Sequence, residues 1–346
     1  MKSQFDDFCN LHAAQSAANS APGPRTVPGR IIAVPGTVSA ALQTLIAAPY
    51  RTPAWDADPQ TPAAWKELVS QLAADTRKQV QTSCGRLGVT LQPDIIEGVA
   101  VYRIRPRTIA PEHRNRLLVN THGGGYVYNP GEAGALEGVL MAGFAQCEVL
   151  SIDYRMPPDH PFPAGLNDAV KVWKAVVAER NPRQIGLFGS SAGGGLAVAT
   201  VLRAQAENVP LPGALSLGSP WVDLTQTGDT YQTNEWLDNI LVSYRGYASR
   251  AAKLYANGHS LSDPLISPIH GEFRDFPPTI LNSGTRDLLL SLTVLTHRKL
   301  RRAGVRAELQ VYEGMSHCQY MSDPACPESE EAFTEISRFF DEHLES

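Results

Sequence analysis

The stretch QIGLFGSSAGGGLAVATVL, Gln184–Leu202, decides the fold of this 346-residue chain. It begins as an apolar, strand-like run and ends as a helical one. Between the two runs, residues 189–193 read GSSAG and match the pattern G-x-S-x-G. So tight a turn from strand to helix leaves room only for very small residues two positions either side of its serine. The pattern predicts that Ser191 stands at a helix N-terminus with its hydroxyl exposed at the sheet edge.

The surrounding sequence predicts the sheet on which this turn would stand. From Val99 onward, short apolar runs alternate with amphipathic helical runs. This alternation is typical of an α/β fold, with a mostly parallel central sheet flanked by helices. The last three strand-like runs, in chain order, are GALSLGSP, PPTILNSG and RAELQVYEG.

Other parts of the chain do not follow the alternation. The first thirty-five residues are rich in Ala, Ser, Pro and Gly, which predicts an irregular arm. Residues 38–48 and 63–84 are predicted helices. An excursion at 220–258 is too long for a plain loop, and its part from 233 to 258 is predicted to be helical.

We expect the excursion and the N-terminal helices to form a helical cap over the carboxyl edge of the sheet, where ligands of parallel sheets bind. The predicted domains are therefore an N-terminal arm with cap helices, residues 1–98, and a catalytic domain, residues 99–346.

Composition excludes several classes of protein. The chain is 43% hydrophobic and 19% charged with a net charge of −5, so nothing indicates a nucleic-acid partner. No apolar run is long enough to span a membrane. The N-terminus lacks the apolar core of a signal peptide, which indicates a cytoplasmic location, although a trimmed secreted or periplasmic form would read the same. The cysteines are odd in number and lack C-x-x-C spacing, which disfavours a disulfide scaffold or a zinc site: Cys9, Cys84, Cys147, Cys318 and Cys326.

A serine nucleophile needs a base, and the base needs an orienting acid, in the chain order serine, acid, histidine. His317 directly follows a predicted strand and would reach the same edge as Ser191. Asp287 follows the preceding predicted strand, and capping of the next helix is its alternative role. The remaining candidates lie in loops before the late strands or in helices: Asp263, Asp275, His259, His270, His297 and His343.

In these features the chain resembles the α/β-hydrolase superfamily, and more narrowly the hormone-sensitive-lipase-like family of bacterial carboxylesterases. The resemblance covers roughly Val99 to the C-terminus. The motifs that carry it, in order, are HGGGYV (122–127), DYRMPPDHPFPAGLNDA (153–169), GSSAGGGLA (189–197), SGTRDLL (283–289) and GMSHCQY (314–320).

The resemblance implies an α/β-hydrolase fold with Ser191 as nucleophile, Asp287 as acid and His317 as base. It also implies an oxyanion hole built from backbone N–H groups of Ala192 and of the HGGG segment. Within that segment we favour Gly124 and Gly125, with Gly123 as the alternative, and His122 as a residue that fixes the loop. Ser190 departs from the aspartate common in the family, which leaves the subgroup and the substrate open.

These expectations describe a serine carboxylesterase that hydrolyses short- to medium-chain acyl esters through an acyl-enzyme. We expect a small-molecule ester as its partner and no metal or organic cofactor. The sequence leaves open whether the protein forms a homodimer. The alternatives are a non-catalytic binding protein on the same fold and a hydrolase of lactones, amides or antibiotic esters. Apolar residues in or near the excursion either line an acyl pocket or pack the cap: Tyr126, Trp221, Leu224, Trp236, Leu237, Ile240, Leu241 and Tyr244.

Overall fold

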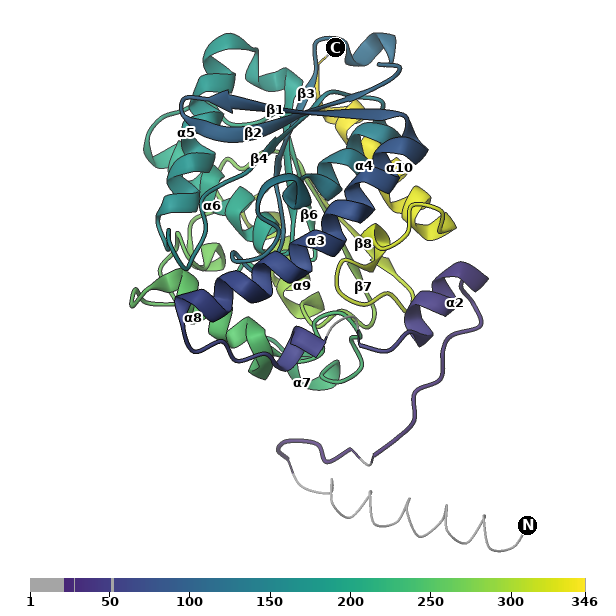
Figure 1. Ribbon diagram of the computed structural model, residues 1–346. Helices are drawn as coiled ribbons and strands as arrows, with labels where there is room; N and C mark the ends of the chain where they lie inside the picture. Colours follow the sequence, from purple (N-terminus) through teal and green to yellow (C-terminus); the bar gives the residue numbers. More distant parts are fainter. Residues whose placement is uncertain (1–21, 28, 51–52, 346) are drawn as a thin grey trace, which may run out of the picture. The chain divides into compact units, whose positions relative to one another are not determined.

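A computed structural model describes residues 22–27, 29–50 and 53–345 (Figure 1). The chain divides into two units, residues 1–34 and 35–346. In the first unit, the described residues form neither helix nor strand. The rest of the predicted N-terminal arm, residues 1–21 and Pro28, and with it Cys9, lies outside the described residues.

The second unit is built on an eight-stranded sheet with strand order β1-β2-β4-β3-β5-β6-β7-β8. Strands β1 and β2 run antiparallel to their neighbours, and the other six are parallel. The predicted, mostly parallel sheet is therefore confirmed. The strands are β1 Val89–Ile96, β2 Val99–Pro106, β3 Leu117–Thr121, β4 Val149–Ile152, β5 Ile185–Ser190, β6 Ala214–Gly218, β7 Thr279–Gly284 and β8 Ala307–Tyr312.

Strand β1 places the start of the sheet at Val89, ahead of the expected domain start at Val99. It pairs with β2 along its whole length through a two-residue turn. The turn residues, Glu97 and Gly98, have φ values of 52° and 77°. Positive φ at both central positions matches the right-handed twist of a hairpin, so this short Glu-Gly turn joins two strands.

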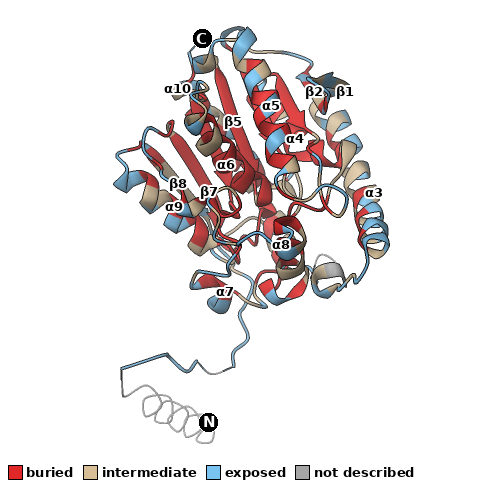
Figure 2. Cartoon of the chain, turned by 90° about the vertical axis from the view of Figure 1, so that its left-hand side faces the viewer, coloured by how far each residue is buried: buried red, intermediate tan, exposed pale blue. Residues whose placement is uncertain are grey.

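Helices cover both faces of the sheet (Figure 2). Helices α5, α6 and α9 share one apolar core with the strands, and α4 and α10 share the other together with α2 and part of α3. The helices are α2 Ala40–Ala47, α3 Pro62–Leu87, α4 Leu136–Ala145, α5 Ala164–Glu179, α6 Ala192–Ala206, α7 Thr230–Thr233, α8 Ser249–Ala256, α9 Leu290–Arg302 and α10 Pro327–His343.

The two predicted N-terminal helices correspond to α2 and α3. The N-cap Ser39 accepts a hydrogen bond from the Leu42 N–H at 3.1 Å and begins α2. Gly88, with φ 64°, ends α3 in the left-handed conformation that favours glycine. None of the described helices is both long and apolar enough to cross a membrane.

The excursion at 220–258 is less helical than the sequence predicts. It contains only α7, a π-helical turn at Tyr244–Ala248 and α8. Between α7 and the π-helical turn, side chains such as Asp238 and Asn234 bond to backbone groups of other segments. These tertiary hydrogen bonds replace the helical ones that the local pattern favours.

Trp173 on α5 anchors one of the two cores. Its side chain is 1% exposed, and its indole N–H donates to the Pro210 carbonyl at 2.9 Å. We expect Trp173→Ala to lower the free energy of unfolding by about 3–5 kcal/mol, because a large cavity and an unpaired carbonyl remain. Urea unfolding measures this difference. Leu295→Ala is the matched control, since Leu295 on α9 is 43% exposed, and an equal loss in both variants would contradict the assignment.

Candidate active site

Ser191 lies at the junction of β5 and α6, where the sequence places it. Its backbone has φ 57° and ψ −126°, a strained conformation for a serine. Its N–H donates to the Gly218 carbonyl of β6 at 2.8 Å, which holds the turn against the sheet. A Cβ at Gly189 or Gly193 would lie 2.3 Å or 1.9 Å from the Thr121 carbonyl oxygen, so both positions require glycine.

Asp287 and His317 follow β7 and β8 and meet at the same edge. His317 Nδ1 lies 3.0 Å from Asp287 Oδ1, and both residues are buried. The Ser283 hydroxyl donates to Asp287 Oδ2 at 2.6 Å, and the Leu289 N–H donates to Oδ1 at 2.8 Å. The helix after Asp287, α9, has Leu289 as its N-cap and no side-chain cap hydrogen bond, so Asp287 bonds to the turn before the helix and does not cap it.

The electrostatics favour an ionised Asp287 beside His317. Burial alone would raise the pKa of Asp287, but His317 and the hydrogen bonds hold it below its ordinary value. Burial alone would lower the pKa of His317, but Cys318 and the Asp287 carboxylate raise it above its ordinary value. A positive charge that arises on His317 is thus stabilised in place.

Asp238 is a site residue that the sequence analysis missed. This fully buried carboxylate accepts backbone N–H groups from both loops of the pair, Leu288 at 2.8 Å and His317 at 3.2 Å. Its other oxygen accepts the N–H groups of Ile240 and Leu241. Burial, followed by the charge of Asp287, raises the pKa of Asp238 to about 6. Within a segment that reads as a helix, no local signal marks such a role.

The glycines of the HGGG segment lie beside Ser191. Gly123, Gly124 and Gly125 line one cavity with it. Gly124 and Gly125 have φ values of 122° and 60°, and a Cβ on Gly124 would lie 2.6 Å from the Tyr128 carbonyl oxygen. In the described chain, the N–H groups of Gly123, Gly124 and Gly125 donate to no backbone or side-chain acceptor. The Ala192 N–H belongs to the first turn of α6, where helical N–H groups lack an intrahelical partner.

His122 packs behind this loop. Its Nδ1 lies 2.8 Å from the Gly123 carbonyl, and its ring stacks on Tyr154 with centroids 4.3 Å apart. The Tyr154 hydroxyl donates to the His122 carbonyl at 2.8 Å. Burial lowers the pKa of His122, so this ring is neutral near pH 7.

Ser191 and His317 open into the same cavity of about 400 Å³. Helix α3 contributes Leu72 and Gln79 to its wall, and the excursion contributes Leu241. A second cavity of about 10 Å³ also touches Ser191 but not His317. Its wall is mostly apolar and aromatic: Gly125, Trp221, Tyr231, Leu241, Tyr244, Tyr247, Ala248, Leu288 and Leu289.

The proposed pocket residues thus separate into two groups. Trp221, Leu241, Tyr244 and Ile240 line one or both cavities, whereas Leu224 is buried in the core. The others lie outside the two linings: Tyr126 stacks on Tyr255, Trp236 is 54% exposed, and Leu237 is partly buried.

Cys318 is a second residue that the sequence analysis did not assign to the site. Its Sγ lies 3.5 Å from His317 Nε2, and it lines the larger cavity. Burial raises the pKa of the Cys318 thiol, and the charge and hydrogen bond of His317 lower it in part. The four described cysteines, Cys84, Cys147, Cys318 and Cys326, are free.

The other histidine and aspartate candidates lie away from this cavity. His259, His270 and Asp275 are exposed. Asp263 Oδ1 accepts a hydrogen bond from the Leu265 N–H of its own loop at 2.8 Å. His297 lies 3.3 Å from the Ala307 carbonyl.

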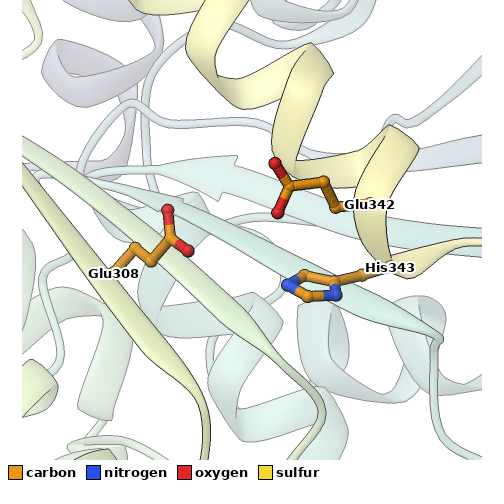
Figure 3. Close-up of side chains that lie close together, drawn as sticks. All are labelled: Glu308, Glu342 and His343. Carbon is orange, nitrogen blue, oxygen red and sulfur yellow. The ribbon is translucent and has the colours of Figure 1, made fainter.

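His343 belongs to a cluster with Glu308 and Glu342, shown in Figure 3, in which the potential ligand atoms lie within 4.8 Å of one another. Glu308 belongs to the first half of β8, so the cluster lies at the sheet edge opposite Ser191. Arg306 Nη2 lies 3.2 Å from Glu342 and 3.5 Å from Glu308. Because these carboxylates already have a cation, we assign no metal to the cluster.

Comparison with known proteins places this geometry in a family. Residues 118–321 match the model of a family described as alpha/beta hydrolase fold. The chain is 28% identical over 263 residues to an acetyl-hydrolase of Streptomyces hygroscopicus, covering 75% of this chain and 86% of the relative. It is 26% identical over 252 residues to an esterase of Acinetobacter venetianus, covering 72% and 82% of the two chains.

Solved structures agree with these relatives. The crystal structure of the esterase E25 superimposes with a TM-score of 0.90 at 41% identity, covering 93% of this chain and 99% of that one. An esterase from the bacterial hormone-sensitive lipase family superimposes with a TM-score of 0.69 at 28% identity, covering 80% and 97%. The chain therefore belongs to the α/β-hydrolase fold family, within the group of esterases that resemble hormone-sensitive lipase.

Proposed function

We propose that this carboxylic ester hydrolase works by two-step acyl transfer, with Ser191 as nucleophile, His317 as base and Asp287 as orienting acid. One observation carries the proposal. The strained Ser191 shares a cavity with His317, whose Nδ1 lies 3.0 Å from the buried Asp287 carboxylate.

In the first step, Ser191 Oγ attacks the ester carbonyl carbon while His317 Nε2 takes the hydroxyl proton. Cys318 Sγ, 3.5 Å from Nε2, is a weak partner that the serine hydroxyl must replace. The tetrahedral intermediate then collapses, and His317 gives the proton to the leaving alcohol. Water attacks the acyl-enzyme with His317 again as base, which releases the acid and restores Ser191.

The carbonyl oxygen becomes negatively charged in both steps. The N–H groups of Gly124, Gly125 and Ala192 are the donors that we propose for it, with Gly123 as the alternative. Two features support these donors: the N–H groups of Gly123, Gly124 and Gly125 all donate to no acceptor in the described chain, and that of Ala192 belongs to the first turn of α6. Losing one such donor typically costs about 2.7–4 kcal/mol of transition-state stabilisation.

The two cavities suggest how the ester would lie. The leaving alcohol must be near His317, which lines only the cavity of about 400 Å³. The acyl chain shares that larger cavity, because the cavity of about 10 Å³ between Trp221 and Tyr244 has room for about one water molecule. We therefore propose short- to medium-chain acyl esters as substrates, with α3 and residues 220–258 as the cap over the larger cavity.

Covalent labelling tests the nucleophile. We expect a fluorophosphonate to label the wild-type protein once, at Ser191, and p-nitrophenyl butyrate hydrolysis to disappear in Ser191→Ala with an unchanged melting temperature. Peptide mapping by mass spectrometry locates the label, and Ser260→Ala, at an exposed loop serine, is the control. Full activity of Ser191→Ala would exclude the mechanism, and an unreactive wild-type protein would favour the non-catalytic binding alternative.

A chain-length profile tests the acyl side. We expect kcat/KM for p-nitrophenyl esters to fall beyond about six carbons, because the acyl chain and the leaving group share one cavity of about 400 Å³. Leu241→Ala, which opens both cavities, should move the optimum to longer chains, with a change of about 1–3 kcal/mol in discrimination per methylene. Leu295→Ala serves as the surface control. An unchanged profile in Leu241→Ala would place the acyl chain elsewhere.

A further inference from the structure

Glu137, on helix α4, is a buried carboxyl group that the acyl-transfer mechanism does not use. Its exposed fraction is 6%, and it lines the same cavity as Ser191, beneath the HGGG loop. The described residues around this cavity include no lysine or arginine. The carboxyl group is therefore held by neutral donors, the side chains of Ser190 and Asn120 and the backbone of Ser190.

Two hydrogen-bond chains converge on Glu137. Ser190 Oγ donates to Glu137 Oε1 at 2.5 Å, and it also lies 2.5 Å from the Tyr320 hydroxyl. Because Ser190 has one proton and gives it to Glu137, Tyr320 must donate to Ser190. On the other side, Asn120 Nδ2 donates to Glu137 Oε2 at 3.3 Å, and Ser151 donates to Asn120 Oδ1 at 2.9 Å. Every proton points toward the carboxylate.

These chains connect the two halves of the catalytic site. Ser190 directly precedes Ser191, and Tyr320 lies in the loop that carries His317. A Cβ at Gly218 would lie 2.1 Å from the Tyr320 hydroxyl and 2.3 Å from Ser190 Oγ. The hydroxyl pair is therefore packed against backbone and has little room to take another arrangement.

We propose that Glu137 is a positioning residue for the reaction, because its carboxylate is the shared acceptor that holds Ser190 and Tyr320 and thereby fixes Ser191 relative to His317. The inference rests on the proposed function, since it presumes the roles of Ser191 and His317. Glu137 itself touches neither of these side chains by a hydrogen bond in the described chain.

The arrangement makes the site sensitive to pH. Burial raises the pKa of Glu137 to about 7, although Ser190 and Asn120 lower it in part. A protonated Glu137 must donate one hydrogen bond. Asn120 Nδ2 cannot accept it, and Ser190 Oγ can accept it only when the protons of Ser190 and Tyr320 reverse, so the hydrogen bonding on one side of Glu137 changes below that pH. The other titratable groups nearby are Tyr154 after β4, Cys318 and Tyr320 after β8, His122 after β3 and Asp75 on α3.

Glu137→Gln tests the proposal, because the amide mimics the protonated carboxyl group. We expect kcat for p-nitrophenyl butyrate to be about tenfold lower than in the wild type at pH 8.5, with KM unchanged, as for a small misplacement of reacting groups. At pH 6 the ratio of wild-type to variant kcat should approach one, because the wild-type Glu137 is then protonated too. The titration of His317 is common to both proteins and largely cancels in the ratio. Glu137→Asp keeps a titrating carboxylate, so its own kcat should fall from pH 8.5 to pH 6 as in the wild type, and its ratio to the wild type should be nearly independent of pH.

The controls separate positioning from general damage. Glu132→Gln, five residues earlier and outside the cavity wall, should match the wild type at both pH values. A kcat ratio for Glu137→Gln that is the same at pH 6 and 8.5, or an unchanged kcat at pH 8.5, would overturn the proposal. If circular dichroism shows that Glu137→Gln is unfolded, Ser190→Ala replaces it, because this variant removes the hydroxyl between Glu137 and Tyr320 and keeps the carboxyl group. The ratio of wild-type to Ser190→Ala kcat should then be about ten at pH 8.5 and approach one at pH 6. An inactive wild-type protein that no fluorophosphonate labels would instead refute the proposed function.

Discussion

The close contact between the end of β3 and the turn after β5 is the constraint on which the site depends. The Thr121 carbonyl lies so near Gly189 and Gly193 that no side chain fits at either position. This contact fixes the strained turn at Ser191, and the chain that continues from Thr121 is the HGGG loop. One backbone approach therefore positions Ser191 and the N–H groups of the HGGG loop together, and it requires glycine in two clusters that lie far apart in the sequence.

The sequence was sufficient for features with a local signal. In a parallel sheet, residues that follow strands meet at one edge, so the placement of Ser191, Asp287 and His317 after β5, β7 and β8 could be read from strand-like runs alone. Asp238 and Glu137 could not be found in this way. Asp238 bonds to residues 50 and 79 positions away, and Glu137 lies on a helix that the sequence analysis did not identify. Their roles follow from tertiary contacts, which leave no periodic pattern.

Asp238 also explains why the excursion departs from its helical prediction. A helix would direct its backbone N–H groups to its own carbonyls, whereas Ile240 and Leu241 donate to the Asp238 side chain. The other oxygen of Asp238 is then directed at the loops of Asp287 and His317. The segment gives up local hydrogen bonds, and its Asp238 side chain instead links residues 238–241 to the loops that carry Asp287 and His317.

Two buried carboxylates other than Asp287 thus support the site, and they are stabilised in different ways. Four backbone N–H groups converge on Asp238, and its pKa rises only to about 6 despite the nearby charge of Asp287. Glu137 receives two neutral side-chain donors and a backbone hydrogen bond from Ser190, and its pKa rises to about 7. The charge of His317 and the backbone donors, which are fixed by the fold, both limit the rise for Asp238. The hydroxyl protons under Glu137 can reorient, so the hydrogen bonding of this network changes near pH 7.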